Sequence, residues 1–221
     1  TDGTATTNAT RSFTVNAVND LPTLTSAQAT LTAGTEDVAY RVNTSDLLQG
    51  FTDADGTLSI SNTISVNQGS IVKSDDGTYY TITTPKDYNG NVQISYGVTD
   101  GIATTDATRS FTLTSVNDAP ELTGTPVTLS AGTEDFAYTI NASDLLQGYS
   151  DVEFSSLSLT NLQVNNGAQI TDNGNGTYTI TPAANYNGPI QISYGVTDGT
   201  ATTNATRSFT VNAVNDLPTL T

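Results

Sequence analysis

The sequence predicts an all-β protein built from tandem seven-stranded Greek-key sandwiches. The first observation is internal repetition, because residues 1–25 recur letter for letter as residues 197–221 and a diverged copy begins at Thr99. The second is pattern, since Thr, Val, Ile and Tyr alternate with polar residues over short runs that Asn-Gly, Asp-Gly and Gly-Thr pairs interrupt. No long helical period appears. A repeat of fixed length on this scale indicates folded units joined in series.

The repeat defines the expected domains. We expect one complete unit over residues 22–119 and a second over residues 120–217, because the segments that start at Pro22 and Pro120 match at a constant offset. Residues 1–21 are then the last strand and linker of a preceding repeat. Residues 218–221 begin a following one.

The strands of the first unit follow from the alternating pattern and the turn residues between runs. We expect them at residues 29–33, 38–42, 57–65, 70–73, 78–83, 92–98 and 107–116.

One short helical turn is expected after the second strand, where Ser-Asp-Leu-Leu-Gln-Gly occurs in both units. Ser45 or Ser143 is its expected N-cap. Among the strand residues, we expect Val38, Tyr40, Val42, Phe111 and Leu113 to form core. The arginine that recurs in the last strand, at positions 11, 109 and 207, is expected to cover the sheet face with its side chain.

Composition excludes several classes of function. The formal charge is −16 with six Lys and Arg in 221 residues, so nucleic acid and anionic membranes are disfavoured as partners. No apolar run approaches the length of a membrane helix, and membrane insertion is not expected. The chain has no His and no Cys, and no Gly-rich phosphate loop precedes a helix, so we expect no enzyme. A pair of acids for glycoside hydrolysis would need a concave site, whereas the expected acidic clusters lie at a convex joint between repeats.

The strand count predicts where the acidic residues lie. Seven antiparallel passes place the two chain ends at opposite poles of a sandwich, so tandem units should form a rod joined end to end. The acidic turns then converge on three junctions. The expected metal ligands are Asp2, Asn19, Asp20, Asp53, Asp55 and Asp100 upstream; Glu36, Asp37, Asp87, Asn117, Asp118, Asp151, Glu153 and Asp198 between the units; and Glu134, Asp135, Asn215 and Asp216 downstream.

Such clusters of carboxylates repel one another unless a cation lies among them. Ca²⁺ is the expected cofactor, because it accepts six to eight oxygens in loose geometry, whereas Mg²⁺ requires a tight octahedron. The absence of His and Cys disfavours softer metals. The alternative for any single Asp in an Asp-Gly pair is turn geometry without metal. For Asn-Gly at 89–90 and 187–188, a simple turn is the favoured interpretation.

These motifs resemble the cadherin-like, immunoglobulin-like repeats. Val116-Asn-Asp-Ala-Pro120 is similar to the cadherin linker, Asp53-Ala-Asp55 to the paired Asp motif, Thr99-Asp-Gly101 to the acidic turn before the last strand, and Glu36 to the glutamate that closes the first strand. The ordered set is closest to the tandem arrays of large calcium-dependent bacterial adhesins of the RTX type. Asp53-Ala-Asp-Gly-Thr lacks a further Asp often found after the Gly, and the second unit has Asp151-Val-Glu-Phe154 instead.

The resemblance implies a calcium-rigidified extender, or stalk, of a long adhesin on the bacterial cell surface, outside the cell. It would project a distal binding domain for cell-surface or biofilm adhesion, with calcium and the neighbouring repeats of the chain as partners. The alternative is a spacer or carbohydrate-binding module of a secreted multidomain enzyme. Residues 4–18, a last strand without its own sandwich, are expected to fold against the first unit or to make a strand-swapped or lattice contact with another copy.

Overall fold

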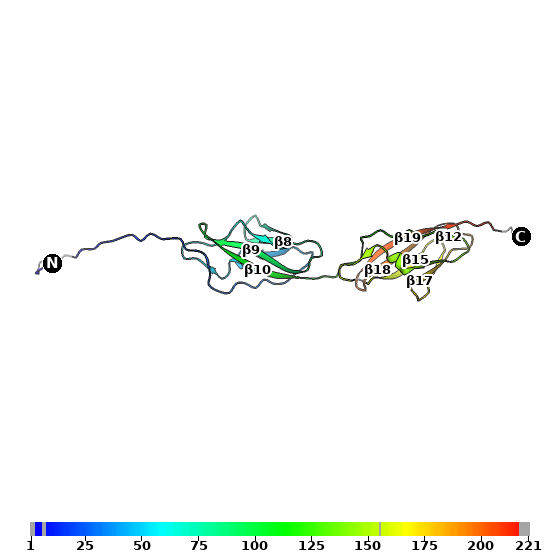
Figure 1. Ribbon diagram of the computed structural model, residues 1–221, viewed down its shortest axis with the longest axis horizontal. Helices are drawn as coiled ribbons and strands as arrows, with labels where there is room; N and C mark the ends of the chain where they lie inside the picture. Colours follow the sequence, from blue (N-terminus) through cyan, green and yellow to red (C-terminus); the bar gives the residue numbers. More distant parts are fainter. Residues whose placement is uncertain (1–2, 6–7, 155, 217–221) are drawn as a thin grey trace. The chain divides into compact units, whose positions relative to one another are not determined.

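The computed structural model describes residues 3–5, 8–154 and 156–216. The chain divides into two compact units, Thr1–Val116 and Asn117–Thr221. Each unit is a sandwich of two β-sheets, so the all-β prediction is confirmed (Figure 1).

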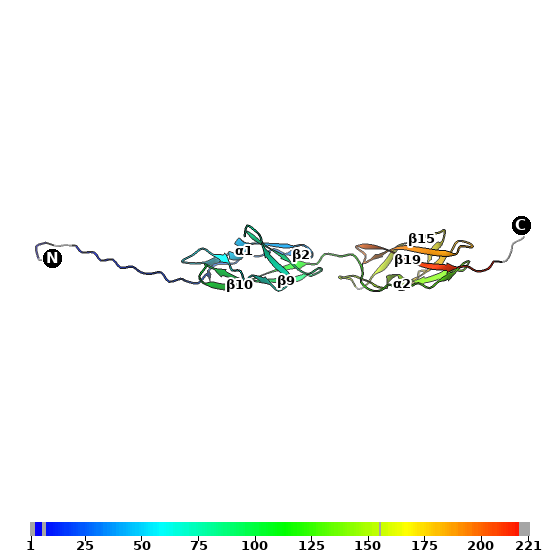
Figure 2. The ribbon, with the colours of Figure 1, turned by 90° about the horizontal axis from the view of Figure 1, so that it is seen from above.

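The larger sheet of unit 1 carries its two longest strands. β9 (Gly90–Thr99) and β10 (Thr104–Thr114) pair antiparallel over ten residue pairs and lie side by side in Figure 2. On the far side of β10, β2 (Gly34–Thr35) runs parallel to it. On the far side of β9 lie β5 (Ser59–Ile60) and β6 (Ser65–Val66).

The second sheet of unit 1 has the order β3-β8-β7 and is antiparallel throughout. Its strands are β3 (Tyr40–Asn43), β7 (Ser70–Lys73) and β8 (Tyr79–Thr83). A short ladder joins β1 (Thr23–Leu24) to β4 (Phe51–Thr52), and α1 (Thr44–Leu48) follows β3.

The core of unit 1 fills the space between these sheets. Alternate residues of β8, β9 and β10 point inward, as a half-buried strand requires. The Tyr40 ring stacks on the Phe111 ring with centroids 3.7 Å apart, and this contact joins the two sheets. Leu47 of α1 is fully buried in the same core.

Unit 2 repeats this arrangement. Its larger sheet has the order β12-β19-β18-β15 and its smaller sheet the order β13-β17-β16. The Tyr138 ring stacks on the Phe209 ring, as Tyr40 does on Phe111. The elements are β11 (Glu121–Leu122), β12 (Gly132–Thr133), β13 (Tyr138–Asn141), α2 (Ala142–Leu146), β14 (Tyr149–Ser150), β15 (Ser158–Val164), β16 (Gln169–Asp172), β17 (Thr177–Thr181), β18 (Gly188–Thr197) and β19 (Thr202–Asn212).

The beginning of each unit differs most from expectation. Residues 29–33 form no strand, and the expected strand at 57–65 is divided into β5 and β6. Val38 was wrongly expected in the core, because its side chain is 63% exposed in the turn before β3. The short helix is present, but its N-cap is Asn43 and not Ser45, and in unit 2 it is Asn141 and not Ser143. Asn and Ser are about equally favourable at the N-cap position, so residue preference alone does not distinguish Asn43 from Ser45 or Asn141 from Ser143.

The first residues of unit 1 carry no strand in their described part. Residues 3–5 and 8–18 have neither helix nor strand, and the side chains of Phe13 and Val15 are 88% and 79% exposed. The expectation that this segment folds as a strand against the first unit is therefore wrong. Its pairing with another copy stays a prediction. The expected start of a following repeat, at residues 218–221, lies outside the described residues.

Both helices are a single short turn. Within the described residues, no helix is long and apolar enough to cross a membrane.

Candidate metal centre

The acidic residues of unit 1 gather in two groups within that unit. We call the first group the entry end; it consists of Asn19, Asp20, Asp53, Asp55 and Asp100. The backbone N–H of Asp20 donates to Asp55 Oδ2 at 2.8 Å, and Asn19 Nδ2 donates to Asp100 Oδ2 at 2.8 Å. Hydrogen bonds thus hold the incoming chain against the turn after β4 and the turn between β9 and β10.

Asp53 organises the turn after β4. Its Oδ1 accepts the N–H groups of Asp55 and Gly56, each at 2.8 Å. Its other oxygen, Oδ2, is buried and has no hydrogen-bond partner among the described residues. A buried carboxylate oxygen without a donor is costly, so this atom fits a cation at the entry end.

Asp100 is held as a carboxylate. The N–H groups of Ala103 and Ile102 both donate to its Oδ1 at 2.7 Å, and these bonds, with that from Asn19, lower the pKa of its side chain. Asp198 of unit 2 is in the same position; the bonds from Thr200 and Ala201 and the Asn117 amide lower its pKa.

The opposite group of unit 1, the exit end, consists of Glu36, Asp37 and Asp87. Glu36 is 1% exposed; its Oε1 accepts the N–H of Val116 at 2.6 Å and its Oε2 accepts Asn89 Nδ2 at 3.2 Å. Asp37 Oδ1 accepts the N–H of Asp87 at 2.9 Å. The Oδ1 atom of Asp87 is buried without a hydrogen-bond partner among the described residues.

Unit 2 repeats the entry end with one difference. Asn117 Nδ2 donates to Asp198 Oδ2 at 2.8 Å, and the N–H of Asp118 donates to Glu153 Oε2 at 3.1 Å. Asp151 Oδ1 accepts the N–H groups of Glu153 and Phe154 at 3.0 and 2.9 Å. Glu153 therefore takes the place that Asp55 has in unit 1. Over the part of unit 2 that the structure describes, Asp151 Oδ2 and Glu153 Oε1 are buried without hydrogen-bond partners.

The exit end of unit 2 has the same frame with one carboxylate fewer. Glu134 is 3% exposed and accepts the N–H of Val214 at 2.6 Å and Asn187 Nδ2 at 3.2 Å. Asp135 Oδ1 accepts the N–H of Asn185, which stands where unit 1 has Asp87. For Asn215 and Asp216 the structure shows a bond from Asn215 Nδ2 to the Asp216 carbonyl at 3.2 Å.

Hydrogen bonds thus connect the expected ligands within each entry end, while metal binding by any of them stays a prediction. Asp2 lies outside the described residues. Asn89 and Asn187 were expected only as turn residues, yet both side chains contact the buried glutamate of their unit. Two reasons explain why the sequence did not predict this contact. Each Asn is far from the glutamate in sequence, and an Asn-Gly pair is already accounted for by a turn.

Arg109 corrects the expectation for the recurring arginine. It is 7% exposed and faces the interior, where Nε donates to the Tyr96 hydroxyl at 3.4 Å and Nη2 to the Asp46 carbonyl at 2.7 Å. Nη1 donates to the Ala29 carbonyl. In unit 2, Arg207 Nε and Nη2 are buried without partners among the described residues. The arginine therefore joins the entering chain to the sheet in unit 1 but makes no matching bonds in unit 2.

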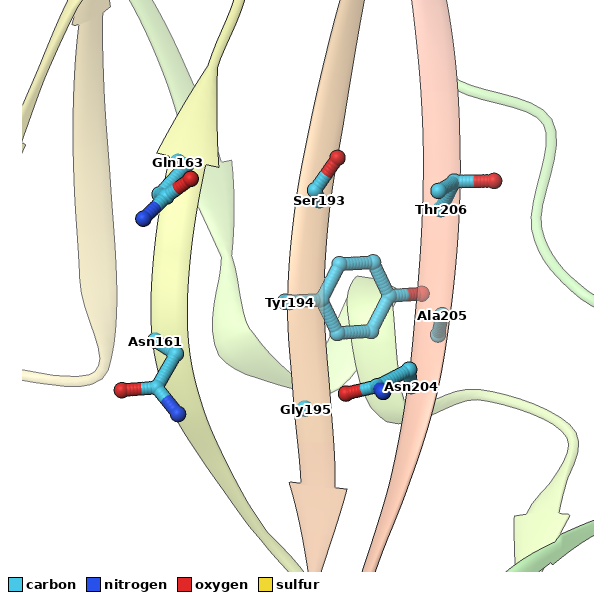
Figure 3. A pocket seen from close by; sticks show the side chains of 8 residues that line it. All are labelled: Asn161, Gln163, Ser193, Tyr194, Gly195, Asn204, Ala205 and Thr206. Atoms are coloured by element: carbon cyan, nitrogen blue, oxygen red, sulfur yellow. The ribbon is translucent and has the colours of Figure 1, made fainter.

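Unit 2 also has a groove on its larger sheet. Figure 3 shows Asn161 and Gln163 of β15, Ser193 of β18 and the side chains of β19 beside it. Its open face is lined by amide and hydroxyl groups, while the Tyr194 ring belongs to the core and is 3% exposed. None of the expected ligands lines this groove.

The oxygen-rich ends agree with a match to a known family. The family model described as "Cadherin-like domain" matches residues 18–114 and again residues 116–212. This chain belongs to the cadherin-like domain family. Two tandem cadherin-like copies therefore account for most of the chain.

The cadherin-like chain spans only a small part of the curated protein that it matches. It is 53% identical over 45 residues to integrin beta-like protein E of Dictyostelium discoideum, which is 20% of this chain and 2% of that protein. Among solved structures, an endo-fucoidan hydrolase of glycoside hydrolase family 107 matches at 22% identity and a TM-score of 0.37, over 88% of this chain and 29% of that one. Extracellular cadherin domains 1–4 of protocadherin gamma B7 match at 12% identity and a TM-score of 0.38, over 83% and 48% of the two chains.

Asp76 lies outside the entry and exit ends, in the turn between β7 and β8, and the pKa of its side chain can be used to test the structure of this turn. The hydroxyl of Ser74 and the N–H and hydroxyl of Thr78 donate to its Oδ1 and lower its pKa to about 2. Because the pKa in the folded unit lies below its usual value, the carboxylate contributes stability at neutral pH that is lost as the pH falls towards 2. We expect the Asp76 carboxyl carbon to titrate near pH 2 by NMR.

The control for this titration is Asp76→Asn. In unit 2, Asn175 Oδ1 already accepts the hydroxyl of Thr177 at 2.7 Å in the equivalent turn. The variant should keep the hairpin and remove the titration. A carboxyl carbon that titrates near pH 4 would contradict the structure.

Proposed function

We propose that this chain is a calcium-stiffened extender segment of a large extracellular adhesin of the RTX type on a bacterial cell surface. The observation that carries the proposal is the buried, donorless carboxylate oxygen at each entry end, Asp53 Oδ2 and Asp151 Oδ2. The same position in two successive units presents the same unsatisfied oxygen. A hard cation is the natural partner for it.

The residues at these ends suit Ca²⁺ in chemistry. All are carboxylates, amides or backbone carbonyls, which are the ligand types that Ca²⁺ takes. Asp53, Asp55 and Asp100 would hold the ion at the entry end of unit 1, and Asp151, Glu153 and Asp198 at that of unit 2. When bound, Ca²⁺ supplies positive charge that cancels the repulsion among these carboxylates.

The covalent chain gives the reason why the ions would stiffen a joint. The N–H of Val116 donates a hydrogen bond to Glu36 at the exit end of unit 1. Asn117 and Asp118 follow directly in the chain and are the first residues of the next entry end. Two residues span at most about 7 Å, so ligands from both ends are tied to one short linker. We propose that Glu36, Asp37 and Asp87 share ions with the Asp118 end of the linker.

The function that follows is mechanical and not enzymatic. A series of such units with stiff joints would hold a distal binding domain away from the cell, for adhesion to surfaces or in biofilms. Membership of the cadherin-like family supports an extender or adhesion-type segment. We also propose an extracellular location, because weak calcium sites of this kind fill only at the millimolar Ca²⁺ concentrations found outside cells.

Small-angle X-ray scattering on the two-unit chain tests the proposal. In Ca²⁺ we expect one extended distribution of distances, and in chelator a broader one, because inter-domain contacts of ordinary size allow relative motion. Asp118→Ala should broaden the distribution in Ca²⁺ while both sandwiches stay folded.

The matched control is Asp172→Ala, which removes the acid at the end of β16 and should leave the distribution unchanged. If chelator leaves the parent chain as straight as Ca²⁺ does, the proposed mechanism is wrong. A packed, metal-independent interface would then replace it.

A further inference from the structure

Unit 2 contains a second groove, between α2 and the turn that follows β14. Its volume is about 620 Å³. Leu146, Tyr149, Phe154 and Leu157 supply apolar surface, and Ser143 and Gln147 supply polar groups. All of the lining residues belong to unit 2, so the groove is complete within one sandwich.

Phe154 distinguishes this groove from the same place in unit 1. Its N–H donates to Asp151 Oδ1 at 2.9 Å, and in unit 1 the N–H of Gly56 donates to Asp53 Oδ1 at 2.8 Å. The two residues are thus structural equivalents, and unit 2 has a benzyl group where unit 1 has a hydrogen atom. The Phe154 side chain is 43% exposed at the edge of the groove. An exposed aromatic ring beside a cavity is a typical platform for a ligand.

The polar part of the groove is neutral or acidic. Within the described part of the chain, no hydrogen bond engages the side chains of Ser143 or Gln147, so their donors and acceptors are available to a ligand. Asp144 and Asp151 also line the groove, and neither forms an ion pair within the described residues. In the absence of Ca²⁺, two carboxylates in a chain of net charge −16 repel an anionic ligand.

We propose that this groove binds a neutral saccharide. A sugar ring combines an apolar face of C–H groups, which can stack on Phe154, with hydroxyl groups at its edge, which both donate and accept hydrogen bonds. Gln147 and Ser143 offer both functions. A purely apolar peptide would leave these groups without partners, and an acidic polysaccharide would face the two carboxylates. Unit 1, with Gly56, lacks the platform.

Ligand-observed saturation-transfer NMR on the full chain tests the proposal. The probes are neutral trisaccharides of glucose, mannose and xylose at about 10 mM, an upper range for weak sites. In chelator we expect saturation transfer to at least one of them and none to trigalacturonate. Phe154→Gly, which gives the groove the residue of unit 1, should weaken binding at least about tenfold, which corresponds to the loss of one stacking contact.

Two further variants make the result specific. Phe154→Tyr keeps the ring and should retain binding, while Gln147→Ala should weaken it without touching the turn. Signal from the anionic probe alone, or equal binding by the parent and Phe154→Gly, would overturn the proposal. So would the absence of transfer to every neutral probe.

The inference is independent of the calcium proposal, although Asp151 appears in both. Binding is therefore measured in Ca²⁺ and in chelator. Saccharide binding that persists in chelator, with no effect of Ca²⁺ on stiffness, would refute the stalk mechanism and leave the groove standing. The reverse result would refute the groove alone.

Discussion

Adding Ca²⁺ to the metal-free chain is expected to raise its melting temperature by several degrees. In the proposed function, folded entry ends bind the ion and unfolded chains scatter the ligands, so binding would stabilise the folded chain by mass action. At tenfold excess over the dissociation constant, one site contributes about 1.4 kcal/mol, and about 1 kcal/mol moves the midpoint of a unit of this size by several degrees. Differential scanning calorimetry in chelator and in millimolar Ca²⁺ measures the shift.

Mg²⁺ at equal concentration is the first control and should do much less, because it requires a tight octahedron. The paired variant Asp53→Asn with Asp151→Asn is the second. It keeps the Oδ1 acceptor that holds each turn and removes the charge of the donorless carboxylate, so most of the Ca²⁺ effect should vanish. Identical melting curves in chelator and Ca²⁺ would exclude calcium as the ligand.

The second large effect is expected from Arg109→Met, which should destabilise unit 1 by about 3 kcal/mol. The substitution keeps much of the buried volume but removes three hydrogen bonds, to the Tyr96 hydroxyl and the Ala29 and Asp46 carbonyls. Bonds from a charged donor contribute about 1.5–3 kcal/mol each and are not additive. Hydrogen exchange in β9 and β10, followed by mass spectrometry, reports the stability of unit 1 separately.

Arg207→Met is the matched control in unit 2. Two of its guanidinium nitrogens are buried without partners in the described structure, so removing them should cost about 1 kcal/mol or less. Exchange in β18 and β19 gives this number. Equal losses in the two units would show that the arginine acts through packing and not through its hydrogen bonds.

The sequence predicted the middle of each unit better than its start. β8, β9 and β10 combine strict alternation with Val, Ile, Tyr and Phe, so period and propensity agree. The expected strand at 29–33 has the same local pattern but meets the sheet through the side chain of Arg109 instead of a backbone ladder. Local strand propensity cannot predict this contact, because the contact depends on Arg109, which is 80 residues further along the chain.

The candidate site followed from strand order rather than from any single motif. Placing Asp53, Asp55 and Asp100 at one pole needs only the count of passes, and the structure joins these turns to Asn19 and Asp20. What escaped prediction depends on side-chain direction. Asn89 reaches Glu36, and Arg109 faces inward, through rotamers that no spacing rule fixes.

The position of β19 has a consequence for how a repeat is made. β19 is the last strand of unit 2 among the described residues, yet it lies inside its sheet between β12 and β18. A ribosome or a secretion channel that delivers the chain from its N-terminus therefore releases a sandwich with an open gap until the final strand arrives. Contacts that distant in sequence close late and slowly. Each repeat should consequently travel as an unfinished sheet and become a stable domain only when its own last residues emerge, which sets the length of chain that must stay protected from aggregation at any moment.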